Sequence, residues 1–195
     1  MFTLITGASS GIGRAIAVRL SAERALVLHG RNQERLAETR LLCAAPDRHI
    51  LWPLDLNETA SITGSLTSLL AERYVEAFIH CAGAVTVLPM RSTDHQTAQA
   101  LMNVNFFSAL EIVNLLLKKK INQHQLTNIV FISSIFSRFG ARGHAAYCAS
   151  KAALDGLMRA LAVELAPAIR VNSILPGALK TSMSAAGFAD PEIVE

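Results

Sequence analysis

Short apolar strand-like segments alternate with helix-like segments along most of the chain, and this order restricts the possible folds more than any other feature. The expected strands cover residues 2–6, 25–29, 49–54, 75–80, 128–133 and 169–175; the expected helices begin near residue 11 and cover roughly 32–42, 58–73, 92–119 and 145–165. Strands joined in this way through helices run parallel, with helices on both faces of the sheet. The sequence therefore predicts an α/β doubly wound parallel sheet of Rossmann type.

The length and composition of the chain fit one globular domain. Of its 195 residues, 51% are hydrophobic and 17% charged, so a sizeable core can form and no disordered segment is indicated. We therefore expect a single domain over residues 1–195. Polar or charged residues interrupt every apolar stretch before it reaches the length of a membrane span. The N-terminus lacks the pattern of a secretory signal, and a cytoplasmic protein is expected.

The net charge and the cysteines indicate which binding partners and metal sites can be expected for this chain. The net charge is only +3, and the one basic run, at residues 118–120, is typical of a solvated helix end rather than of a nucleic-acid surface. We expect no nucleic-acid partner. Cys43, Cys81 and Cys148 form no CxxC pair, which indicates reduced thiols and no metal site.

A glycine-rich loop follows the first expected strand, where residues 6–13 read TGASSGIG. Gly7 permits the sharp turn from strand to helix, and Gly11 and Gly13 allow a phosphate and the strand to approach the helix closely. The free N–H groups at a helix N-terminus attract a pyrophosphate. A tight turn without a ligand is the alternative. The loop residues expected to contact a dinucleotide are Gly7, Ser9, Ser10, Gly11, Ile12 and Gly13.

The end of the second strand predicts which dinucleotide binds. Residues 28–32 read LHGRN and include no carboxylate; an acidic residue there would bind the 2′-hydroxyl of NAD and repel the 2′-phosphate of NADP. Arg31 can bind a 2′-phosphate through two N–H groups, with Asn32 beside it. Arg14, just after the glycine loop, is expected to add positive charge near this phosphate. These residues favour NADP(H), and the alternative for Arg31 is a solvated surface arginine.

A Tyr-Lys pair predicts acid/base chemistry. Tyr147 and Lys151 are four residues apart in an expected helix, so both side chains lie on one face. An ammonium close to a phenol, together with the positive nicotinamide ring of an oxidised cofactor, favours the phenolate and lowers its pKa. This prepares Tyr147 to exchange a proton with a carbonyl or alcohol oxygen. A single YxxxK pattern also arises by chance.

The motifs at residues 6–13 and 147–151 resemble those of the short-chain dehydrogenase/reductase family, and the resemblance covers nearly the whole chain in order. The resemblance implies that Ser134, thirteen residues before Tyr147, orients the substrate carbonyl. It implies that Lys151 also binds the nicotinamide ribose and that Asn105 holds a water that relays protons. An ordinary polar residue within a helix is the alternative for Asn105.

The same resemblance implies further cofactor contacts and shows one departure. Asp55, with Leu56, would contact the adenine ring, although a turn or cap residue is the alternative for Asp55. The further contacts implied are Ala82 and Gly83 at the ribose, with Pro176, Gly177 and Thr181 near the nicotinamide. The family usually has Asn-Asn before Ala-Gly, whereas this chain has His80 and Cys81. We expect His80 to be structural.

The function predicted from these motifs is an NADP(H)-dependent oxidoreductase for a carbonyl or alcohol, with a non-catalytic NADP(H)-binding sensor or scaffold as the alternative. The substrate itself is not predicted; residues 84–93 and 182–195 would form its pocket. Relatives usually continue into a seventh strand and a final helix, which this sequence, ending at Glu195, is expected to lack. The helices near 92–119 and 145–165 are apolar on more than one side, which predicts a homodimer or homotetramer.

Overall fold

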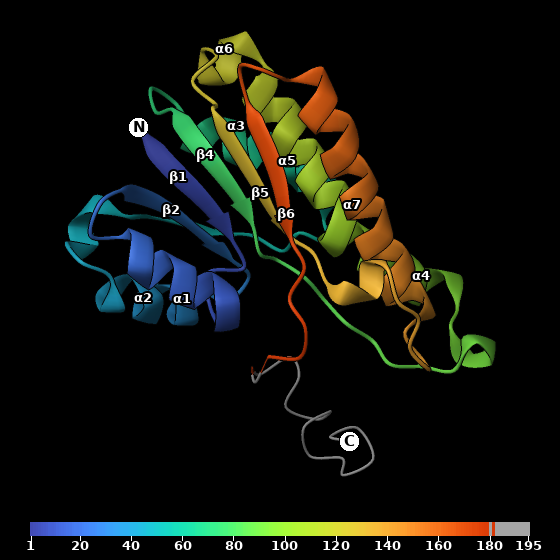
Figure 1. Cartoon of the computed structure of the whole chain (residues 1–195). Coiled ribbons are helices and arrows are strands. Elements are labelled where there is room, and N and C mark those ends of the chain that lie inside the picture. The colour runs from blue at the N-terminus through green and yellow to red at the C-terminus, as the bar shows by residue number, and fades with distance from the viewer. Residues whose placement is uncertain (180, 182–195) are drawn as a thin grey trace.

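The structure is a computed structural model that describes residues 1–179 and 181. Six parallel strands form one sheet in the order β3-β2-β1-β4-β5-β6 (Figure 1). The strands are β1 (Phe2–Thr6), β2 (Ala25–Gly30), β3 (Ile50–Pro53), β4 (Val75–His80), β5 (Asn128–Ile132) and β6 (Arg170–Ile174). Every end lies within one residue of the expected bound. The doubly wound Rossmann-type fold is therefore confirmed.

Helices cover both faces of this sheet, as the alternating pattern requires (Figure 1). On one face, α1 (Gly11–Leu20) and α2 (Gln33–Leu42) enclose a small core with β1 and β2. On the other face, α3 (Thr59–Leu69), α5 (Ser108–Leu117) and α7 (Ala145–Glu164) enclose the larger core. This larger core includes Phe78 and Phe131, whose ring centroids lie 6.4 Å apart.

The long helix expected over residues 92–119 is interrupted. A short 3₁₀ turn, η2 (Met90–Ser92), precedes α4 (His95–Met102); a π-helical turn, η3 (Asn103–Phe107), then leads into α5, and α6 (Lys119–Asn122) follows. A π turn has the same broad apolar pattern as an α-helix, so periodicity did not show it. Such turns are often found at functional sites, and Asn105 lies at the centre of this one.

The expected helix over residues 58–73 is also shorter than predicted. It ends at Leu69, and Glu72 adopts a left-handed backbone with φ of 61°. A left-handed residue cannot continue a right-handed helix. The chain therefore turns directly into β4.

By length and composition alone, the stretch His95–Leu117 could cross a membrane, with a mean hydropathy of 1.6. Length and apolar composition are weak evidence for a membrane span, because core helices of globular proteins share both properties. Here α4 packs on α7, and α5 packs on α3 and β4. The stretch is therefore part of the helical packing on this face of the sheet.

The order of the strands determines where a ligand can bind. The chain moves outward from β1 to β3 and then returns to the other side of β1 with β4. In open α/β sheets, such a reversal leaves a crevice at the carboxyl ends of the central strands. The glycine loop after β1 and the segment after β4 meet at this point.

Candidate active site

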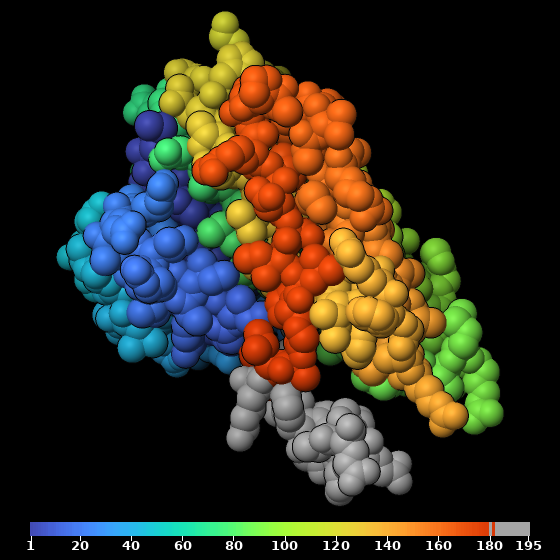
Figure 2. Space-filling view, in the orientation of Figure 1, coloured from blue at the N-terminus to red at the C-terminus, as the bar shows by residue number. Residues whose placement is uncertain are grey.

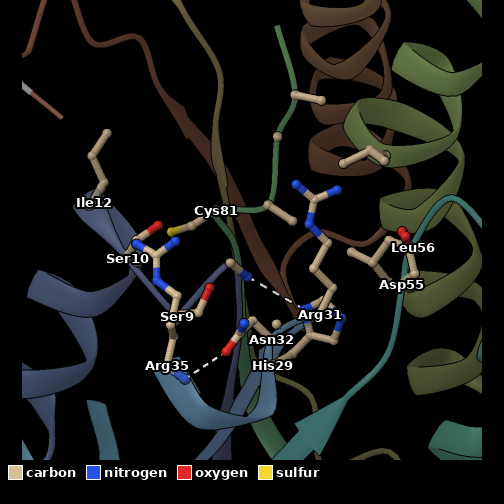
Figure 3. Close-up of a pocket in the computed structure, with 18 of the residues that line it drawn as sticks. Ser9, Ser10, Ile12, His29, Arg31, Asn32, Arg35, Asp55, Leu56 and Cys81 are labelled. Atoms are coloured by element: carbon tan, nitrogen blue, oxygen red, sulfur yellow. Dashed lines mark hydrogen bonds between the residues drawn. The ribbon is translucent and has the colours of Figure 1, made fainter. Parts of the chain in front are cut away.

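A cavity of about 480 Å³ lies at the carboxyl ends of β1, β2 and β4. Figure 3 shows side chains from several elements converging on it. The predicted cofactor residues that line it are Gly7, Ser9, Ser10, Gly11, Ile12, Gly13, Arg31, Asn32, Asp55, Leu56, Ala82, Gly83 and Thr181. Tyr147, Lys151, Pro176 and Gly177 do not line this cavity.

The glycine loop is closely packed against its neighbours. Gly7 has a left-handed φ of 68°, and a Cβ there would lie 2.8 Å from the amide nitrogen of Ala82. A Cβ on Gly13 would lie 2.3 Å from the carbonyl oxygen of Gly7. Both distances are too short for any side chain. The loop therefore brings the N-terminus of α1 against the cavity, where Ser10 makes no side-chain cap, and the free N–H groups suit an anion.

Two arginines line the cavity. Arg31 follows β2 as predicted, whereas Arg35, in the first turn of α2, was not predicted. Figure 3 shows Arg35 extending toward Ser9 and Ser10, with Arg31 on another side of the cavity. The sequence signal that could have identified Arg35 is its place in the first turn of the helix that follows Asn32, close to the end of β2.

Arg14 does not line the cavity, so the expectation that it adds charge there is not supported by its position. Its guanidinium donates to the carbonyl oxygen of Ser9 at 2.7 Å, to the hydroxyl of Thr39 at 2.9 Å and to the Glu38 carboxylate at 3.1 Å. Arg14 therefore fixes the glycine loop and α1 to α2.

Asn32 and Asp55 stabilise the turns at the edge of the cavity. The Asn32 side chain accepts a hydrogen bond from the backbone N–H of Arg35 at 2.8 Å and so caps α2. The Asp55 carboxylate accepts from the backbone N–H of Asn57 at 2.9 Å. Asp55 thus makes the turn contact considered as its alternative, while it also lines the cavity.

His29 is a buried part of the cavity wall that the sequence reasoning missed. Its Nδ1 accepts a hydrogen bond from the backbone N–H of Gly7 at 3.4 Å, and its Nε2 donates to the carbonyl oxygen of Leu54 at 3.1 Å. Burial lowers its pKa to about 4, so the ring is neutral near pH 7. His29 joins the glycine loop to the end of β3, a role that only the strand order reveals.

His80 has the structural role that was expected of it. The Thr6 hydroxyl accepts from the N–H groups of Cys81 and Ala82, both at 3.1 Å, and donates to Nδ1 of His80 at 2.9 Å. Nε2 of His80 therefore carries the proton. It faces the backbone of the π turn at residues 104–105, without a hydrogen bond of good geometry. Burial lowers the pKa of His80 to about 3.

Tyr147, Lys151 and Ser134 come together where β5 meets the start of α7. The Lys151 ammonium nitrogen lies 5.9 Å from the centre of the Tyr147 ring and donates to the carbonyl oxygen of Ile132 at 3.0 Å. The Ser134 side chain lies close enough to the Tyr147 hydroxyl to act on its pKa. The Ser134 oxygen also accepts from the backbone N–H of Phe136 at 3.2 Å.

The environment of the pair differs from the sequence expectation in one respect. Burial raises the pKa of Tyr147, and the neighbouring Ser134 side chain only partly opposes this rise. The residues of the chain alone therefore do not produce the predicted lowering, which also counted the positive nicotinamide ring of the oxidised cofactor. Helix spacing reveals the neighbouring ammonium but not the loss of water around the phenol. Burial lowers the pKa of Lys151 to about 8, while Cys81 and Asp155 act in the opposite direction.

Asn105 joins three segments of the site. Its side-chain oxygen accepts from the N–H of Ala84 at 2.7 Å, and its side-chain nitrogen donates to the carbonyl oxygen of Ala84 at 3.0 Å and to the Ser150 hydroxyl at 2.8 Å. Both amide N–H groups are thus in use. A relay water would have to bind the remaining lone pair of the side-chain oxygen or the backbone nearby.

The loop that carries Pro176 is tied to the catalytic segment, because the N–H of Ile135 donates to the carbonyl oxygen of Pro176 at 3.1 Å. Residues 182–195, expected to form part of the substrate pocket, lie outside the described residues. Within the described part of the chain, His, Cys, Asp and Glu residues do not gather in any group of three that could hold a metal.

A glycine loop at the switch point of a doubly wound sheet, with a Ser-Tyr-Lys cluster beside it, defines a dinucleotide-binding oxidoreductase. The chain matches the sequence profile of the short chain dehydrogenases over residues 2–192. It belongs to this family.

Individual relatives agree with this assignment. The chain is 30% identical to D-erythrulose reductase of Gallus gallus over 191 residues, which cover 97% of this chain and 75% of the relative. It is 35% identical to the uncharacterized oxidoreductase YciK of Escherichia coli K12, with coverage of 97% and 78%. A short chain dehydrogenase structure from Escherichia coli CFT073, complexed with NADPH, has a TM-score of 0.86 and 31% identity, and the match covers 98% of this chain and 83% of that one.

Proposed function

We propose that this protein is an NADP(H)-dependent oxidoreductase that transfers a hydride between the nicotinamide ring and a carbonyl or secondary alcohol carbon. The observation that carries the proposal is the cluster of Ser134, Tyr147 and Lys151: the Lys151 ammonium lies 5.9 Å from the centre of the Tyr147 ring, and the buried Ser134 acts on the Tyr147 hydroxyl. When bound, the cofactor supplies or accepts the hydride. The chain's own residues must then orient the substrate and move one proton.

The residues of the cavity fit a dinucleotide. Gly7 and Gly13 let the loop pack directly on the start of α1, so the free N–H groups at the N-terminus of that helix can meet a pyrophosphate. Both arginines of the cavity wall suit a 2′-phosphate, since guanidinium groups bind phosphate through paired N–H groups. The proposed cofactor set is the predicted one, including Pro176 and Gly177, with Arg35 added.

We assign the proton chemistry to three side chains. Tyr147 donates its hydroxyl proton to the carbonyl oxygen during reduction and removes it from the alcohol during oxidation. The Ser134 oxygen accepts a hydrogen bond from the backbone N–H of Phe136, so the hydroxyl hydrogen can be donated to the carbonyl oxygen of the substrate. Lys151 stabilises the phenolate that remains on Tyr147. Asn105 holds the backbone of Ala84 and helix α7 in place around this centre.

The deciding experiment is a panel of ketones and aldehydes with NADPH, followed by absorbance, with Tyr147→Phe as the matched control. The phenylalanine ring preserves the packing but has no proton to donate, so we expect the rate to fall roughly 100-fold or more. A Tyr147→Phe protein with the full rate would contradict the mechanism. Tight NADPH binding without turnover of any carbonyl would favour the sensor or scaffold alternative.

Cofactor preference can be tested at Arg31. Arg31→Asp removes a phosphate contact and adds a repulsive charge, so the dissociation constant of NADPH should rise roughly 10- to 100-fold, in keeping with about 1.5–3 kcal/mol for a charged hydrogen bond. NADH binding should change much less. Arg48→Asp, at an exposed arginine outside the cavity, makes the same charge change as a control. Equal losses for both nucleotides in Arg31→Asp would refute the assignment of NADP(H).

We further infer a homodimer, or a homotetramer built from such dimers, of single 1–195 domains in the cytoplasm. An apolar groove of about 330 Å³ between α5 and α7 supports this assembly. Its apolar lining comprises Leu110, Val113, Leu117, Leu157 and Leu161. Light scattering should show a monomer for Leu110→Glu; an unchanged mass for this variant would exclude an interface at the groove.

A further inference from the structure

Asp155 is a buried carboxylate that the mechanism above does not use. It lies on α7, four residues after Lys151 and eight after Tyr147, so the three side chains share one face of the helix. The whole residue is only 3% exposed. A buried charge is unfavourable unless it is paired or hydrogen-bonded, so its surroundings need to be examined.

The carboxylate joins two segments of the site to α7. One oxygen accepts from the hydroxyl of Ser137 at 2.5 Å, and the other accepts from the hydroxyl of Ser173 at 2.9 Å. Ser137 closes the 3₁₀ turn η4 (Ile135–Ser137), which is capped by Ser134. Ser173 lies in β6, three residues before Pro176. Asp155 therefore holds the turn after Ser134 and the strand that leads to the nicotinamide loop.

The charge of Asp155 also acts on Lys151. The groups around the Lys151 ammonium are Tyr147 and Asp155 from the same helix, Cys81 and His80 from the end of β4, and the Ile132 carbonyl of β5. His80 is neutral, because burial lowers its pKa to about 3, and burial raises the pKa of the Cys81 thiol to about 12. Asp155 is thus the carboxylate within this group.

We propose that Asp155 is a positioning residue for the proposed reaction: its carboxylate fixes the segments that present Ser134 and Pro176, and its negative charge keeps the buried Lys151 as an ammonium. This proposal rests on the proposed function, which needs that ammonium to stabilise the Tyr147 phenolate. A purely structural role would require only the two serine hydrogen bonds. The two roles differ in how a change of charge affects the titration of Lys151.

The test is a direct titration of Lys151 in the full chain. The protein is labelled with ¹³C at the lysine Cε, the Lys151 resonance is assigned with Lys151→Arg, and its chemical shift is followed against pH. In Asp155→Asn, which keeps the shape and removes the charge, Lys151 should titrate roughly one pH unit lower than in the wild type. Ser173→Ala removes one hydrogen bond and keeps the charge, so its titration should match the wild type.

The kinetic counterpart is the pH profile of kcat/KM for carbonyl reduction. The rate depends on the ammonium form of Lys151, so activity is lost as the pH rises through the Lys151 pKa. This alkaline limb should move to lower pH in Asp155→Asn and should stay in place in Ser173→Ala. If Asp155→Asn does not fold, as judged by circular dichroism, Asp155→Ser removes the same charge and keeps a hydroxyl.

The outcomes separate this proposal from the proposed function. An unchanged Lys151 titration in the charge-removing variant overturns the role of Asp155, whatever the enzyme turns over. An equal shift in Ser173→Ala also overturns it, since the effect would then follow the hydrogen bond and not the charge. A shift limited to Asp155→Asn in a protein without carbonyl reduction supports the electrostatic effect and refutes the proposed function.

Discussion

Replacing Gly13 with alanine tests the contact between the glycine loop and helix α1. The new Cβ would lie 2.3 Å from the carbonyl oxygen of Gly7 and 2.7 Å from its carbonyl carbon. Both are backbone atoms, so no side chain can rotate away. Either α1 or the loop must shift by about an ångström to restore contacts of 3.4 Å or more.

Gly64 provides the matched control, because it lies within α3 and an added Cβ meets nothing within 4 Å. Alanine in a helix interior is about 1 kcal/mol more favourable than glycine. Gly64→Ala should therefore stabilise the protein by up to that amount. Gly13→Ala gains the same propensity but suffers overpacking, which typically costs about 1–3 kcal/mol and here falls at the upper end. The net expectation is a loss of about 2 kcal/mol.

The two variants should move the Tm in opposite directions. For a chain of this length, 1 kcal/mol corresponds to about 2–4 °C, so Gly13→Ala should melt roughly 4–8 °C lower and Gly64→Ala up to about 4 °C higher. Calorimetry measures the Tm, and fluorescence titration measures NADPH affinity, which should fall only in Gly13→Ala. The reasoning would be refuted by a Gly13→Ala protein with wild-type Tm and wild-type affinity.

Two further predictions concern buried polar groups. The pKa values of His29 and His80 in the folded protein, about 4 and about 3, lie below the unfolded value of 6.5, so the unfolded chain binds more protons as the pH falls. The contribution of the two neutral rings to the free energy of unfolding is therefore complete above pH 6.5 and decreases toward pH 4, by up to about 1.4 kcal/mol per pH unit for each ring. Denaturant unfolding across this pH range measures the decrease, and His80→Asn should make it smaller. Asn122, fully buried, accepts from the N–H of Val75 at 2.7 Å and donates to its carbonyl oxygen at 2.9 Å. Asn122→Leu removes both of these hydrogen bonds and should lower the free energy of unfolding by about 2–4 kcal/mol. Gln96→Ala, at an exposed position, is the control and should change that free energy little. Equal free energies of unfolding for the two variants would contradict the role of Asn122.

The sheet could be predicted from the sequence because each of its elements has a local cause. Apolar runs give the strands, Asn32 caps α2, and the glycines at the end of β1 permit the turn. The alternation of strands and helices then leaves a parallel sheet as the compatible architecture. The π turn was not predicted, because hydrophobic periodicity cannot distinguish it from an ordinary helix.

The site was only partly predictable for a different reason. Motif spacing identified Tyr147, Lys151 and Ser134, which the structure brings together. The rise in the Tyr147 pKa could not be predicted, since it depends on water removed by segments distant in sequence. Asp155 was missed because its serine partners come from η4 and β6, eighteen residues away on either side.

The tip of the molecule formed by residues near 90 and 140 is visible in Figure 2 as an extension beyond the sheet. Its base is η3, the wide turn that places Asn105 against Ala84 and Ser150. A π turn contains one residue more than the corresponding turn of an α-helix, so deleting one residue from it would let the stretch close as a regular α-helix without the wide turn. A one-residue deletion in this stretch should therefore be tolerated far less than a substitution, because it would remove the wide turn that places Asn105 even if every other side chain were kept.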